Sequence, residues 1–229
     1  MIGKKLIIQS DEADEIYQTE ELLRNNQLQD VIKRVMKNQK PEKAQITLEK
    51  EEITVFCDVI APPARLIVIG GSHIAIPLVV LARLVDFSTV LVDARSAFAN
   101  HERFPSVDEI VVGWPAEVLE KLEINENTFV AFVSHDDKFD VPALKVALQS
   151  KARYIGALGS RKTHANRVAR LLEESVPMEL IEQIHAPIGL DIGASGAAEI
   201  AVSILAEMLA VRNGKVFTSR AAALSAQVQ

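Results

Sequence analysis

The sequence predicts an α/β protein whose main part is a Rossmann-like, doubly wound and mainly parallel sheet, preceded by a small N-terminal α+β unit. Two observations support this fold class. From Arg65 onward, short apolar runs alternate with segments of helical periodicity, as in a parallel sheet covered by helices. The first of these runs, LIVIG, leads through two glycines into a helical segment, which is how a doubly wound sheet usually opens.

The N-terminal part, residues 1–61, has a different character from the rest. The segment 18–38 is polar, with apolar residues at roughly helical spacing, and predicts a helix. The segment 46–56 alternates around a polar centre and predicts a hairpin or two short strands. Pro62 and Pro63 then interrupt the chain. We therefore expect a small domain over 1–61, a Rossmann-like domain over 62–214 and a tail over 215–229.

In the second domain, strands and helices follow one another in order. Strands are expected at 66–70, 88–93, 108–113, 128–134 and 153–159. Helices are expected at 73–85, 115–122, 141–150, 162–175 and 197–213, the last followed by Gly214 in a C-cap position. Pro77 lies near the first turn of the first of these helices, where its missing N–H costs little.

Composition and charge exclude several classes of protein. The 229 residues carry a net charge of −6, so no general nucleic-acid-binding surface is expected. The single cysteine, Cys57, excludes an intrachain disulfide framework and a cysteine-rich zinc site. The N-terminus lacks the apolar run of a signal peptide, and the most apolar segment, IAIPLVVLA, is about half as long as a bilayer crossing requires. We expect a cytoplasmic protein that does not contact a membrane.

The glycine turn, Gly70-Gly71-Ser72-His73, lies where an open parallel sheet usually binds a phosphate-bearing ligand. It departs from the G-x-G-x-x-G pattern, because Ser72 stands where the second glycine belongs and Ala75 where the third does. Ala75 is small enough for helix–strand packing, but the Ser72 side chain occupies space that a pyrophosphate would use. Either a phosphate site or merely a tight turn is consistent with this motif.

Asp93 ends the second strand about twenty residues after the glycines, where a dinucleotide-binding fold places a carboxylate for ribose hydroxyls. Arg95 follows and could meet a phosphate. The alternative is that Asp93 caps the next turn and that Arg95 is simply solvated.

Other polar residues follow further strands of the predicted sheet. His135, Asp136 and Asp140 come after the fourth strand, and Gly159, Ser160 and Arg161 after the fifth. Gly189 and Asp191 precede the last helix. Each could instead be a helix cap or a turn residue, but their common position at the carboxyl ends of the strands predicts one pocket.

Little in the sequence predicts catalysis. There is no G-x-S-x-G elbow, no P-loop and no H-E-x-x-H spacing. His73 and His135 could act as acid–base groups, although a hydrogen-bonding role toward a ligand is the preferred interpretation. Cys57 is best explained as a packed, small hydrophobic residue. We assign no catalytic residue and no metal site.

Five motifs in order resemble those of the XdhC/CoxI family of xanthine dehydrogenase accessory proteins. They are GGSHIA, VDARSAFANHERFP, SHDDKFDVPAL, YIGALGSRKT and APIGLDIGASGAAEIAVSILAEMLAVRNG, and the resemblance covers roughly residues 62–214. The N-terminal part is shorter than in longer relatives and lacks their glycine-flanked cysteine motif, which Cys57 does not replace.

The resemblance implies a protein that binds the molybdenum cofactor, protects it and inserts it into a xanthine dehydrogenase-type molybdenum hydroxylase. A cysteine desulfurase is a further candidate partner, and a homodimer is expected. The residues that match the family's motifs are Gly70, His73, Ala75, Asp93, Arg95, Asn100, Arg103, Phe104, Pro105, His135, Asp136, Asp140, Gly159, Ser160, Arg161, Pro187, Gly189, Asp191 and Gly193. The expected cofactor site is formed by Gly70, Gly71, Ser72, His73, Asp93, Arg95, His135, Asp136, Gly159, Ser160, Arg161, Gly189 and Asp191.

Two alternatives remain open at this point. The fold and Asp93 also permit an NAD(P)-dependent oxidoreductase. The second alternative is a scaffold that acts only through protein contacts, with a pocket blocked by Ser72.

Overall fold

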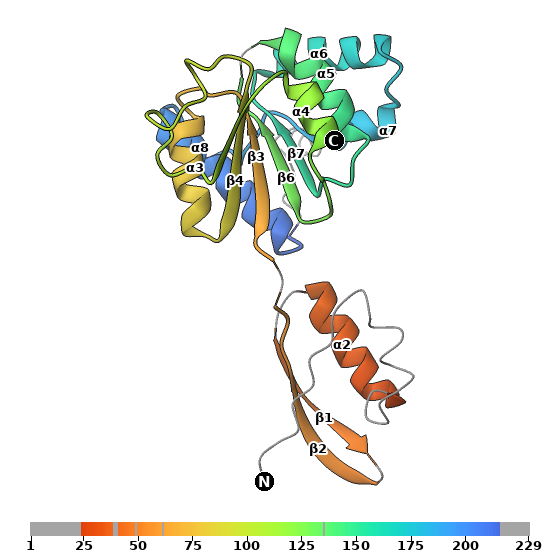
Figure 1. The fold of residues 1–229 in the computed structure, drawn as a ribbon. Coiled ribbons are helices and arrows are strands. Elements are labelled where there is room, and N and C mark those ends of the chain that lie inside the picture. Colours follow the sequence, from red (N-terminus) through yellow and green to blue (C-terminus); the bar gives the residue numbers. More distant parts are fainter. Residues whose placement is uncertain (1–23, 39–40, 49, 61, 135, 216–229) are drawn as a thin grey trace. The chain divides into compact units, whose positions relative to one another are not determined.

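The computed structural model describes residues 24–38, 41–48, 50–60, 62–134 and 136–215 (Figure 1). The chain divides into two compact units, residues 1–62 and 63–229. None of the helices in these described ranges is long and apolar enough to cross a bilayer.

The N-terminal unit consists of a helix and a hairpin. Helix α2 (Asn26–Asn38) precedes strands β1 (Glu42–Leu48) and β2 (Glu51–Cys57), which pair in antiparallel fashion. Leu28 of the helix and Ile46 of β1 form a small core, against which Cys57 packs. Burial raises the pKa of the Cys57 thiol. The thiol therefore stays protonated and packs as a small apolar group. The predicted helix and hairpin are present, although residues 18–23 of the predicted helix lie outside the described part.

The second unit contains a six-stranded, entirely parallel sheet, which confirms the predicted Rossmann-like fold. Its order is β5-β4-β3-β6-β7-β8. The strands are β3 (Ala64–Ile69), β4 (Phe87–Asp93), β5 (Glu109–Val112), β6 (Thr128–Phe132), β7 (Tyr154–Ala157) and β8 (Ile184–His185). Because the chain leaves β3 toward β4 and later returns to β6 on the other side, the switch point lies between β3 and β6.

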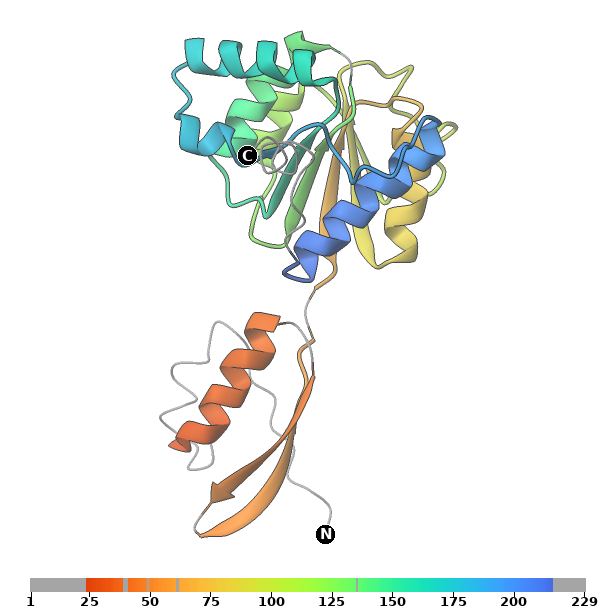
Figure 2. The same ribbon diagram turned by 180° about the vertical axis from the view of Figure 1, so that it is seen from behind.

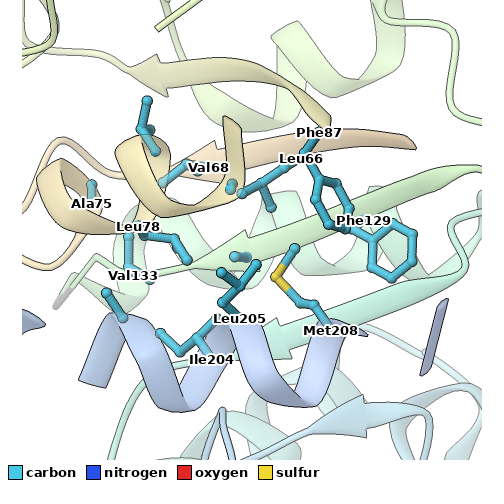
Figure 3. Packing of buried hydrophobic residues seen from close by; sticks show 14 of the residues in the cluster. Leu66, Val68, Ala75, Leu78, Phe87, Phe129, Val133, Ile204, Leu205 and Met208 are labelled. Carbon is cyan, nitrogen blue, oxygen red and sulfur yellow. The ribbon is translucent and has the colours of Figure 1, made fainter. Parts of the chain in front are cut away.

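Helices cover both faces of the sheet. Helices α3 (Ala75–Leu84) and α8 (Ala197–Arg212) lie side by side on one face (Figure 2). The other face carries α4 (Pro115–Lys121), α5 (Asp137–Leu148), α6 (Arg161–Glu173) and α7 (Met178–Ile181). On the α3–α8 face, Leu78, Ile204 and Met208 pack over Leu66 and Val68 of β3 (Figure 3).

Three elements differ from the sequence-based expectation. Helix α5 begins at Asp137, not at 141. The side chain of Asp136 caps the helix there, because it accepts a hydrogen bond of 3.0 Å from the Lys138 amide. Pro142 is then inside the helix. Helix α7 and strand β8 were not predicted, because segments of four and two residues carry no readable periodicity.

Candidate functional site

A hollow lies at the carboxyl edge of the sheet, beside the switch point. This cavity, here called the α6 cavity, has a volume of about 450 Å³. It receives residues from the end of β6, the loop after β7 and helices α3, α5, α6 and α8: Ile74, Ser134, Asp137, Leu158, Gly159, Ser160, Thr163, Arg167 and Ile200. A hollow of this size at a switch point is where an α/β fold usually binds a small-molecule ligand.

The N-terminus of α6 opens into this cavity. Ser160 caps the helix, and its hydroxyl accepts a hydrogen bond from the Thr163 amide at 3.1 Å. Gly159 has a φ of +145°, and a Cβ there would lie 3.0 Å from Thr163 Cγ2, so a side chain at this position would be strained. The next two residues, Arg161 and Lys162, are exposed. The first turn of the helix therefore carries two cations and no acidic residue.

A buried ion-pair network lines the same cavity. Arg167 is 1% exposed, and its guanidinium lies 3.2 Å from Asp137 and 3.3 Å from Asp140. Ser134 donates a hydrogen bond of 2.5 Å to Asp140. Burial raises the pKa of Asp140 to about 6, against the opposing effects of the Ser134 hydrogen bond and the Arg167 charge. The Nε–H of Arg167 has no acceptor among the described residues.

The two glycine amides of the glycine turn are hydrogen-bonded within the protein. The Gly70 amide donates to the Val92 carbonyl at 2.8 Å, and the Gly71 amide donates to Asp93 at 2.8 Å. A Cβ on Gly71 would collide with the carbonyl oxygen of Phe98. The Ser72 hydroxyl is shielded from solvent and has no partner in the described part of the chain. Two amides that a dinucleotide-binding turn would offer to a pyrophosphate are thus already engaged.

Asp93 lies at the end of β4, as predicted, but its carboxylate faces the protein. Besides the Gly71 amide, it accepts hydrogen bonds from the Arg95 amide and from the Arg95 guanidinium, each at 2.9 Å. Burial favours a higher pKa for this carboxyl, but these hydrogen bonds outweigh it and hold its pKa below the usual range. The cavity beside it, here called the β4 cavity, measures only about 10 Å³. Arg95 also stacks on the ring of Phe98, at 4.0 Å from the centroid.

The last loop is anchored to α8. Glu207 of α8 accepts hydrogen bonds from the Gly189 amide at 2.8 Å and from the Tyr154 hydroxyl at 2.5 Å, and it pairs with His185 at 3.2 Å. Burial favours a raised pKa for Glu207, but the His185, Tyr154 and Gly189 hydrogen bonds hold its pKa below the usual value. Gly189 has a φ of +92°, and a Cβ there would meet the Ser203 hydroxyl. This loop is therefore held by internal contacts.

Five of the predicted site residues line one or the other of the two cavities. Gly159 and Ser160 line the α6 cavity, whereas Gly70, Asp93 and Arg95 line the β4 cavity. The other predicted residues line neither of them: Gly71, Ser72, His73, Asp136, Arg161, Gly189 and Asp191. His135 lies outside the described residues.

Sequence reasoning missed Arg167 and did not assign Ser134 or Asp137 to the site. A signal for Arg167 was present, because it precedes the buried Leu171 by four residues and therefore shares its face of α6. A charged residue on the apolar face of a helix indicates either a buried ion pair or a ligand contact.

Comparison with known proteins agrees with the fold and with the order of the motifs. Residues 66–208 match the family model described as the XdhC Rossmann domain. A Bacillus subtilis protein named as a probable subunit of xanthine dehydrogenase is 32% identical over 158 residues, which are 69% of this chain and 46% of that protein. The Escherichia coli molybdenum cofactor insertion chaperone PaoD is 39% identical over 90 residues, which are 39% of this chain and 28% of PaoD.

A solved structure shows the same relationship in three dimensions. The crystal structure described as a xanthine dehydrogenase from Bacillus halodurans aligns with a TM-score of 0.61 and 34% identity, covering 73% of this chain and 47% of that one. The chain thus spans about half or less of the length of these relatives. Since the family model matches well over half of the chain, the motifs, the sheet order and these similarities lead to one conclusion: the chain belongs to the XdhC family, through its XdhC Rossmann domain.

Proposed function

We propose that this chain is a maturation factor that binds the molybdenum cofactor and delivers it to a xanthine dehydrogenase-type molybdenum hydroxylase. The observation that carries the proposal is the α6 cavity of about 450 Å³ in an XdhC Rossmann domain, at the edge where such folds hold ligands. The similarity to a protein named as a molybdenum cofactor insertion chaperone supports the same role.

The chemistry of the cavity suits an anionic cargo that is held and then released. At the start of α6, beside the cavity lining, the exposed Arg161 and Lys162 supply positive charge, and the first turn of the helix supplies backbone N–H groups. Leu158 and Ile200 add apolar walls that limit access of water. Such contacts bind a guest without transforming it, so we propose a carrier and not an enzyme that turns over a substrate of its own.

The oxidoreductase alternative requires Asp93 to meet a ribose. In the structure, the Asp93 carboxylate accepts hydrogen bonds from Gly71 and Arg95, and the adjacent β4 cavity is about 10 Å³. The large cavity lies elsewhere, beside α6. This arrangement favours the carrier over a dinucleotide-dependent enzyme, and a cavity of that size also favours it over a scaffold without a pocket.

The expected partners follow from the same role. We propose a cytoplasmic homodimer that meets the cofactor-binding subunit of the hydroxylase, with a cysteine desulfurase as a further partner. Leu84 and Val80 on α3 and Val202 on α8 are 75%, 43% and 48% exposed, and these neighbouring helices offer an apolar face for the second copy. Light scattering of the wild type and of Leu84→Glu tests this point: a dimer that the substitution dissociates agrees with it, and a monomeric wild type contradicts it.

The main experiment is to express the full chain in a host that makes the cofactor. The purified protein is oxidised, and the fluorescent pterin derivative is quantified against protein. A loaded sample is then mixed with cofactor-free hydroxylase, and the hydroxylase activity that appears is measured. We expect retained pterin and transferred activity. A wild-type protein that retains no pterin, or one that retains NAD(P) instead, would contradict the proposal.

A further inference from the structure

The β7–α6 junction differs from the other helix starts at the carboxyl edge of the sheet. A helix N-terminus carries partial positive charge, so cations in its first turn are unfavourable unless an anion is bound there. Helix α6 nevertheless begins with Arg161 and Lys162 and has no acidic residue in its first turn. By contrast, α4 and α5 carry Glu117 and Asp137 in theirs. A local rule broken in this way commonly marks a functional site.

A second observation at the same cavity points to a ligand. Ser160, Thr163 and Arg167 follow one another at helical spacing and all line the α6 cavity. Arg167 is 1% exposed, yet its Nε–H has no acceptor among the described residues. A buried donor without an acceptor is costly unless a ligand or a water completes it.

The glycine turn is not equivalent to this junction. The Gly70 and Gly71 amides are bonded to Val92 and Asp93, and no side chain can be added at Gly71 without moving Phe98. By contrast, Gly159 and Ser160 line the cavity, and the two exposed cations follow them directly in the sequence. The two features that a phosphate needs, backbone amides at a helix start and nearby positive charge, therefore coincide at α6.

We infer that the phosphate-binding element of this domain is the β7–α6 junction, formed by Gly159, Ser160, Arg161 and Lys162. Arg167, further along α6, lines the same cavity. The element takes a phosphate monoester. This assignment rests on the proposed cofactor-binding function and locates the phosphate of the cargo. In dinucleotide-binding folds, the turn after the first strand binds the phosphate. In this domain, the junction after the fifth strand, β7, has that role.

The test uses the full, ¹⁵N-labelled chain titrated with inorganic phosphate at constant chloride concentration. We expect the largest amide shifts at Ser160, Arg161 and Lys162, with no comparable change at Gly70 and Gly71. Changes that centre on the glycine turn, or that scatter over the surface, would overturn the assignment. So would tighter binding of NAD⁺ than of phosphate at the same α6 amides, because that result would assign the site to a dinucleotide.

Matched charge variants give the second readout. Arg161→Gln combined with Lys162→Gln is expected to weaken phosphate binding about tenfold or more. Lys121→Gln combined with Lys151→Gln removes the same charge from exposed positions at the opposite edge of the sheet, and we expect a change of about twofold or less, due to net charge alone. Equal losses in the two double variants would show a nonspecific charge effect and overturn the assignment.

Retention of molybdopterin separates this inference from the proposed function. If the wild type retains the pterin and Arg161→Gln with Lys162→Gln retains it equally, the α6 assignment fails and the carrier function stands. If the wild type retains no pterin but phosphate still shifts the α6 amides, the carrier function fails and the phosphate site stands.

Discussion

Replacing Asp93 by alanine is expected to destabilise the Rossmann domain, although its position at the end of β4 first suggested a ligand contact. The substitution removes the acceptor of the buried Gly71 amide and of the Arg95 amide. A buried donor left without an acceptor costs about 1–3 kcal/mol. The Arg95 guanidinium is 47% exposed and can return to water, so its ion pair adds about 1 kcal/mol or less. We expect a total loss of about 1–4 kcal/mol.

The assay is urea unfolding at pH 7, followed by the fluorescence of Trp114. This is the only tryptophan of the sequence, and it lies against Phe139 in the Rossmann domain, at 5.0 Å between ring centroids. Arg95→Ala is the control, because it removes the exposed partner but keeps the buried acceptor. It should cost less than Asp93→Ala, with an unchanged dependence on urea.

The pH dependence gives an independent check. The folded-state pKa of Asp93 is lowered, so its stabilising contribution is present above the unfolded pKa of about 3.9 and is lost as the pH falls through the folded value. The difference between wild type and Asp93→Ala should therefore shrink in acid. Two results would refute this account of the carboxylate. One is an Asp93→Ala protein as stable as the wild type at pH 7, and the other is an Arg95→Ala protein that is less stable than the Asp93→Ala protein.

Three further substitutions test neighbouring parts of the site. Gly71→Ala should destabilise the domain by about 1–3 kcal/mol, because its Cβ would collide with the Phe98 carbonyl. Gly196→Ala has open space around its Cβ and changes only the N-cap of α8, so it should cost less, about 1 kcal/mol or less. Equal midpoints for the two would contradict the packing. Asp140→Asn should reveal a pH-dependent difference: burial raises the folded pKa of Asp140 to about 6, so the wild type should lose up to about 3 kcal/mol relative to Asp140→Asn as the pH rises from about 4 to about 7. Parallel pH profiles of the urea midpoint would show that this carboxyl titrates normally. Ser160→Ala removes the cap of α6 and should cost about 1 kcal/mol in urea unfolding, and an unchanged midpoint would argue against the capped start of this helix.

Much of the fold could be predicted because it depends on patterns that the local sequence carries. The run LIVIG predicted β3, and the alternation of apolar strands with helical segments predicted a parallel sheet, which the structure confirms. The start of α5 was placed four residues too late, because several acidic residues after β6 could cap a helix and only the structure shows that Asp136 does so. Strand β8 could not be predicted, since it exists only through its pairing with β7.

The site could be predicted less well, because its geometry depends on which side chains meet. The position of Asp93 at the end of β4 followed from its spacing to the glycines, but its hydrogen bond to Gly71 depends on tertiary contacts. Likewise, Ser160 and Arg161 were placed at the carboxyl edge from the motif, while the buried Arg167 with its two carboxylates was not expected. Helical periodicity shows that Arg167 lies on the same face of α6 as the buried Leu171. It does not show which carboxylate side chains lie opposite that face.

The most direct test of the central claim is X-ray diffraction from crystals of the full chain loaded with molybdopterin, with the anomalous signal of molybdenum used to locate the cofactor. We predict cofactor density in the α6 cavity, with its phosphate against the amides of Arg161 and Lys162. Density in the β4 cavity with the phosphate at Gly70 and Gly71, or a fully loaded protein with an empty α6 cavity, would contradict the account.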